Sequence, residues 1–196
     1  MKIEQRNELL QQMLETELGG VLVYETALLC VLNDELKEEW EKYLEQTKAH
    51  VRIVQDLMEA LQVMPQETPG RLVVRHIGRS LVDAMKMAKA SAPPPDAEIV
   101  ACECVVHAET KDHANWELLS AYGETAKGDD KKAIDAAVEE IEDEEDEHLY
   151  HSKGWCRELS IANLGMKPVL PPPEEQKDVK TAIGAARAKQ ARTELI

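Results

Sequence analysis

The chain has 196 residues, of which 43% are apolar, 4% are aromatic and none is phenylalanine. This length fits one domain with a sizeable core, which must be built from Leu, Val, Ile, Ala and Met, a set typical of helical proteins. The net charge of −15 argues against nucleic acid and anionic membrane surfaces as partners, because both require a basic face.

Apolar residues recur at helical spacing along the chain, whereas sustained strand-like alternation is missing. The pattern predicts a first helix from about Gln5 to Leu32 and a second that starts after a turn at Asn33-Asp34 and runs to about Leu61. Asn33 or Asp34 can supply the N-cap of the second helix. A third helix is predicted over residues 71–90, before the consecutive prolines of "SAPPPD", which cannot continue a helix.

Asp96 can cap a long helix from Ala97 to about Thr125, and "KGDDKK" turns the chain into another from about Lys131 to Ser160. Residues 166–196 contain a polyproline stretch and an Ala-rich end, and are expected to form a linker and an arm, helical when docked on a neighbouring subunit. We therefore expect an all-α fold in residues 1–165. Its two antiparallel helical hairpins would form a four-helix bundle with a helical crossover, followed by an extended C-terminal tail.

The four cysteines form no C-x-x-C pair, which favours free thiols in a reducing compartment. The N-terminus does not resemble a signal peptide, and no apolar run approaches the length of a membrane span. We expect a cytoplasmic protein that does not associate with membranes.

The acidic run "EEIEDEEDEHLYH", residues 139–151, contains two residues that do not fit a solvated face. At about 100° per residue, Glu145 and His148 fall in the same sector as Ile141 and Leu149. A buried carboxylate beside a buried imidazole is costly unless a positive charge compensates. A metal ion would do so, because Glu-x-x-His directs both side chains toward one point.

The other long helices interrupt their apolar stripes in the same way. The first helix places Glu17 in its stripe, the second places Thr47 and His50 there, and the helix after Asp96 places Glu109 and Asp112 there. Residues equally far from a turn lie at the same level of an antiparallel hairpin. Glu17 should therefore be level with His50, and Glu109 with His148, which indicates one polar layer across the bundle.

These residues resemble the ligand pattern of the ferritin-like superfamily of di-iron and di-manganese carboxylate bundles. That pattern has one Glu from each of two helices and a Glu-x-x-His motif from each of the other two. The resemblance implies metal ligands at the following positions: Glu17, His50, Glu109, Glu145 and His148. It also implies iron or manganese, one or two ions per chain, redox chemistry on oxygen or peroxide, and a tyrosine near the metals at Tyr24.

The first Glu-x-x-His motif departs from the pattern, since it reads "TKAH" with Thr47 in place of the glutamate. Asp112, one turn beyond Glu109, is the candidate to replace the missing carboxylate, and His113 could assist. Two hypotheses follow. The chain is a metal-binding, ferritin-like protein, with a homodimer as the expected assembly, or it is a metal-free helical scaffold or interaction protein that retains a degraded site.

Overall fold

The computed structural model describes residues 2–177 and 179–194, and every regular element among them is a helix. The expected all-α class is therefore confirmed. In chain order the elements are α1 (Ile3–Ala27), α2 (Asp34–Ala60), α3 (Pro69–Ser91), α4 (Pro94–Gly123), α5 (Gly128–Asn163), the 3-10 helix η1 (Pro173–Glu175) and α6 (Thr181–Glu194). None of the helices in these residues combines the length and apolarity needed to cross a membrane.

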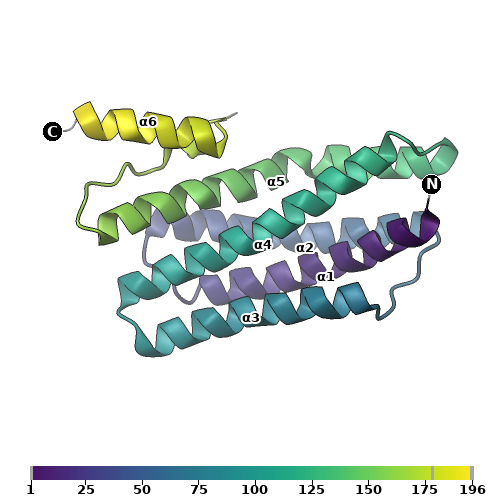
Figure 1. Cartoon of the computed structure of the whole chain (residues 1–196), viewed down its shortest axis with the longest axis horizontal. Helices are drawn as coiled ribbons and strands as arrows, with labels where there is room; N and C mark the ends of the chain where they lie inside the picture. Colours follow the sequence, from purple (N-terminus) through teal and green to yellow (C-terminus); the bar gives the residue numbers. More distant parts are fainter. Residues whose placement is uncertain (1, 178, 195–196) are drawn as a thin grey trace.

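Helices α1, α2, α4 and α5 enclose the interior, and α3 lies outside them (Figure 1). Helix α1 packs against α2 and α4, and α5 packs against the same two helices, so that these four contact one another in a ring. Helix α3 contacts α1 and α4 and connects the two hairpins. The four enclosing helices are the ones whose stripes carry the candidate ligands.

The turn between α1 and α2 forms as the sequence predicts. The Asn33 side chain accepts a hydrogen bond from the backbone N–H of Leu36 at 3.0 Å and caps α2. Glu98 of α4 accepts hydrogen bonds from the backbone N–H groups of Leu32 (2.7 Å) and Asn33 (2.8 Å). The carboxylate thus fastens one hairpin to the other.

Two helix starts differ from the expectation. Helix α4 begins at Pro94, so Asp96 lies in its first turn instead of capping it. Proline is tolerated there because the first N–H groups of a helix have no intrahelical acceptor. Helix α5 begins at Gly128, ahead of the expected Lys131; Gly128 has a φ of 63°, which glycine adopts without strain.

The apolar core is divided into two clusters along the bundle. One lies toward the α1–α2 turn and includes Tyr24, Leu36, Trp40, Val105 and Trp155. The other lies toward the α4–α5 turn and includes Leu10, Val54, Leu57, Leu119 and Ile141. The candidate ligands lie between these clusters in each of the four helices, so the core itself frames a polar layer.

The C-terminal segment packs against its own chain, and its docking on a neighbouring subunit stays a prediction. Both η1 and α6 contact α5 (Figure 1). Glu174 of η1 is buried, and its Oε2 atom accepts a hydrogen bond from Nη2 of Arg157 on α5 at 2.9 Å. Arg192 of α6 pairs with Glu158, which is also buried. These ion pairs hold the segment against α5.

Candidate metal centre

The structure brings all six candidate ligands into one buried layer. The residues come from four helices, and each is at most 5% exposed: Glu17, His50, Glu109, Asp112, Glu145 and His148. Helical spacing explains the convergence, because each of these residues shares the stripe of its helix with core residues. No loop residue is needed to complete the layer.

The levels inferred from the hairpin geometry are correct. Nδ1 of His50 lies 3.8 Å from Oε2 of Glu17, and Nδ1 of His148 lies 3.6 Å from Oε2 of Glu109. Each pair joins two helices that are connected by a turn. The two residues of a pair are equally far from that turn. The polar layer therefore crosses the whole bundle at a single height.

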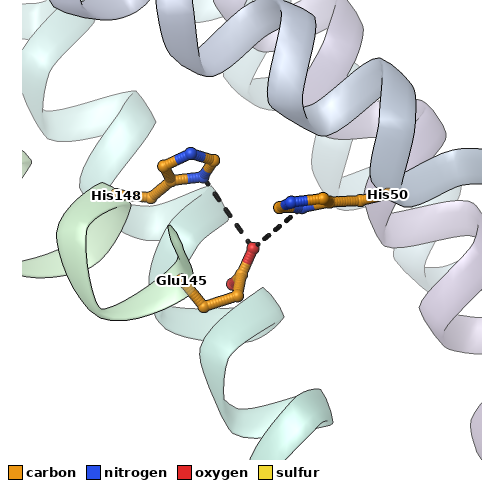
Figure 2. A group of neighbouring side chains, drawn as sticks. All are labelled: His50, Glu145 and His148. Carbon is orange, nitrogen blue, oxygen red and sulfur yellow. Dashed lines mark ion pairs between the residues drawn. The ribbon is translucent and has the colours of Figure 1, made fainter. Parts of the chain in front are cut away.

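Glu145 lies at the centre of this layer. Its Oε1 atom is 3.2 Å from Nδ1 of His50 and 3.8 Å from Nδ1 of His148, and Figure 2 shows the carboxylate pointing between the two rings. Two groups of potential ligand atoms, each with all atoms within 4.8 Å of one another, share this residue: His50–Glu145–His148 and Glu17–Asp112–Glu145. Glu145 is therefore placed to serve two adjacent positions at once.

Seven side-chain atoms of the layer are buried without a hydrogen-bond partner in the described part of the chain. They are Glu17 Oε2, His50 Nδ1, Glu109 Oε2, Asp112 Oδ1, both carboxylate oxygens of Glu145, and His148 Nδ1. Leaving one buried polar atom unpaired costs about 1–3 kcal/mol, and native structures contain few such atoms. Seven in one place indicate that a cation or protons complete the layer.

Both imidazole rings are held from their outer side. Nε2 of His50 is 2.8 Å from a carboxylate oxygen of Glu144, and Nε2 of His148 is 3.0 Å from the side-chain amide oxygen of Gln46. An acceptor at Nε2 keeps the proton there, so that Nδ1 presents its lone pair to the layer. Gln46 and Glu144 are not among the residues that the helical pattern singles out.

Three carboxyl groups of the layer have raised pKa values. Burial, followed by the charges of Asp112 and Glu145, raises the pKa of Glu17 well above its usual range. Burial and the neighbouring charges of Glu145 and Glu109 do the same for Asp112. Burial and the charge of Glu109 raise the pKa of Glu145 to about 8. Without a cation, the layer would therefore hold protons at neutral pH.

The Thr47 hydroxyl donates its proton within its own helix. The acceptor is the backbone carbonyl of Tyr43 at 2.8 Å, one turn earlier in α2. Asp112, the candidate to replace the missing carboxylate, directs its unpaired Oδ1 into the group formed with Glu17 and Glu145. The position of Asp112 agrees with the role expected from the sequence.

Two aromatic residues border the layer. Nε1 of Trp116 donates a hydrogen bond to Oε1 of Glu17 at 3.1 Å and fixes that carboxylate. Tyr24 is fully buried, and its ring packs edge-on against His148 with centroids 6.1 Å apart. Burial, and next the charge of Glu109, raise the pKa of Tyr24, so its hydroxyl keeps its proton.

An open cleft of about 300 Å³ reaches Glu145 from the α4–α5 side. His113 and Trp116 line it, and His113 pairs with Asp146 at 2.8 Å instead of entering the layer. His76 and His107 are exposed on the surface. A small molecule could therefore approach Glu145 without crossing the apolar clusters.

Comparisons of this chain with protein-family models, curated proteins and solved structures find no match. The arrangement of the layer thus carries the functional argument.

Proposed function

We propose that the chain is a ferritin-like metal-binding protein that holds iron or manganese in the polar layer. The proposed ligands are Glu17, His50, Glu109, Asp112, Glu145 and His148. The observation that carries the proposal is the convergence of seven unpaired buried donor atoms on one space. Four carboxylates can neutralise two divalent ions, and mixed carboxylate and imidazole donors suit iron and manganese.

Each residue has a defined part in this proposal. Glu145, shared by both groups of potential ligand atoms, would contribute a ligand to each group, and His50 and His148 would supply nitrogen ligands. Gln46 and Glu144 fix the two rings, and such outer hydrogen bonds orient ligands and raise their basicity. When bound, iron or manganese would supply redox chemistry on oxygen or peroxide, which would enter by the cleft at Glu145.

The second candidate function is a metal-free helical scaffold or interaction protein. The observation that favours it is the raised pKa of Glu17, Asp112 and Glu145, because neutral carboxyl groups can share protons in place of a metal. Thr47, whose hydroxyl donates its proton within its own helix, also fits a degraded site. The acidic run of residues 139–151 and the C-terminal segment would then bind a partner protein.

Addition of Fe²⁺ to metal-free protein in air separates the two functions. The metal-centre proposal predicts that the chain accelerates iron oxidation, followed by ultraviolet absorbance, and that Glu145→Gln abolishes the acceleration. The scaffold would be favoured if Fe²⁺ oxidised no faster with the protein than in buffer alone and if Fe²⁺ or Mn²⁺ did not change the melting temperature. Assembly as a homodimer and a cytoplasmic location remain predictions, the first testable by sedimentation of the purified chain.

A further inference from the structure

A second group of metal-ligating side chains lies outside the polar layer, where the C-terminal segment meets the helices. Glu39 comes from α2, His151 from α5 and Glu175 from η1, and one potential ligand atom of each lies within 4.8 Å of the others. Each of these side chains is 13–20% exposed, so the group is covered but within reach of solvent. The polar layer does not use any of them.

Too many oxygens surround one nitrogen in this group. Nδ1 of His151 lies 3.1 Å from Oε1 of Glu39 and 3.3 Å from Oε2 of Glu175, and the hydroxyl of Tyr43 is 2.8 Å away. A ring nitrogen has one proton or one lone pair and can satisfy only one of these neighbours well. The Tyr43 hydroxyl can donate to Oε1 of Glu39 at 3.1 Å, and a cation between the nitrogen and the two carboxylates would offer a partner to both carboxylates at once.

The two carboxylates are oriented by an indole behind them. Trp155, which is 1% exposed, shares its single Nε1–H between Oε2 of Glu39, at 2.9 Å, and Oε1 of Glu175. The second oxygen of each carboxylate is thereby turned toward His151. Such outer hydrogen bonds are what hold metal ligands in position.

Solvent reaches the group through an acidic cleft. The cleft has a volume of about 340 Å³, and His151 and Glu175 form part of its wall. Asp143, Asp146 and Glu147 also line it, together with Lys177 and Lys180, so that carboxylates outnumber lysines in the wall and would attract a cation. The opening lies between α5 and the C-terminal segment, which lie side by side in Figure 1.

We propose that Glu39, His151 and Glu175 bind one divalent transition-metal ion, which fastens the C-terminal segment to α2 and α5. One imidazole and two carboxylates leave coordination positions for water from the cleft. Glu175 is the only ligand supplied by the C-terminal segment, so the ion couples the docking of residues 173–194 to metal availability. This site is independent of the ligands assigned to the polar layer.

Mn²⁺ serves as the probe, with two measurements on the full chain: ions bound per chain at equilibrium, and hydrogen exchange of residues 173–177 and 179–194. Mn²⁺ should slow this exchange by roughly tenfold or more in the wild type, because ligand binding to the docked state opposes local opening. Glu175→Gln, which keeps an acceptor for Trp155, should bind about one ion fewer and lose the Mn²⁺ effect. Asp143→Asn changes the charge of the same cleft by the same amount. It should keep both the bound ion and the slower exchange with Mn²⁺.

Two further variants separate this site from the polar layer and from damage to the segment. Glu145→Gln should lose ions from the layer but keep the Mn²⁺ effect on exchange. Glu39→Gln changes α2 alone and should lose the same ion as Glu175→Gln. The proposal is overturned if Glu39→Gln and Glu175→Gln bind as many ions as the wild type. It is also overturned if Asp143→Asn loses as many bound ions as those two variants.

Discussion

Thr47 and Gly20 face each other where α2 crosses α1, beside the polar layer. A Cβ atom built on Gly20 would lie only 3.2 Å from Cγ2 of Thr47, so the missing side chain of Gly20 leaves the space that the threonine methyl group fills. Thr47 occupies the position where a Glu-x-x-His motif would carry its glutamate. Thr47 is buried and lies one turn before His50 in α2, which places position 47 beside the proposed metal centre.

Thr47→Glu should raise the affinity for Mn²⁺ or Fe²⁺, or the number of ions bound, if the layer is a metal centre. In a metal-free bundle the same change buries an uncompensated carboxylate, which costs several kcal/mol, of order 3–5, on the scale of broken buried ion pairs. Melting the variant with and without Mn²⁺ distinguishes the two. A lowered melting temperature that metal does not restore would contradict the metal centre.

The acidic run should divide by helix face. Glu140 is exposed and Glu147 forms only an exposed pair with Lys42, so Glu140→Gln and Glu147→Gln should change the free energy of unfolding by no more than about 0.5–1 kcal/mol. Glu145→Gln should weaken Mn²⁺ binding by at least about 100-fold. Loss of a residue that only hydrogen-bonds to a metal ligand already weakens binding by up to about 100-fold, and loss of a ligand should cost more. Equal metal affinity in all three variants, measured by calorimetric titration, would contradict the position given to Glu145.

The candidate ligands could be found from the sequence because each is a polar residue within an apolar helical stripe, as for Glu17 and His148. The hairpin geometry then predicted their common level. Their hydrogen-bond partners could not be found this way, because Gln46 and Glu144 lie at positions where polar residues are ordinary. The all-helical fold followed from periodicity, but the start of α4 at Pro94 did not, since the sequence suggested Asp96 as its cap.

The site at the C-terminal segment was missed for a different reason. Glu175 follows a proline-rich stretch without helical periodicity, and nothing local indicates where such a stretch docks. Only long-range contacts, such as the pairing of Glu174 with Arg157, bring it to His151. Periodicity identifies faces of helices, but it does not give the path of an irregular segment.

Metal-free protein should become less stable as the pH rises from about 4.5 to about 8. The pKa of Glu145 is about 8 in the folded state, whereas its ordinary value, expected in the unfolded state, is 4.5. The folded state therefore binds more protons than the unfolded state in this pH window. The free energy of unfolding therefore falls with pH, by a few kcal/mol at about 1.4 kcal/mol per pKa unit. Glu145→Gln should flatten this slope in chemical denaturation.

Metal binding should show the opposite pH dependence, because the ligands must lose protons to bind. The affinity for Mn²⁺ should rise from about pH 6 to 8, with protons released on binding. A wild-type slope equal to that of Glu145→Gln, or an affinity independent of pH, would contradict the raised pKa of Glu145.

Arg157→Met should release the C-terminal segment. The substitution removes the arginine from buried Glu174, and breaking a buried pair costs about 3 kcal/mol or more. Limited proteolysis should then cut within residues 166–194, where we expect the wild type to resist cleavage. Arg187→Met is the matched control, since Arg187 forms only an exposed hydrogen bond with Gln176, and its unchanged digestion pattern is expected.

The metal content of protein purified without chelator tests the metal centre most directly. The measurement compares two chains that both lack the proposed second site, Glu175→Gln and Glu175→Gln/Glu145→Gln, by elemental analysis. We expect about one to two iron or manganese ions per chain in the first and a marked loss in the second. An equal metal content in the two chains, or none in either after incubation with Fe²⁺ and Mn²⁺, would contradict a metal centre at Glu145.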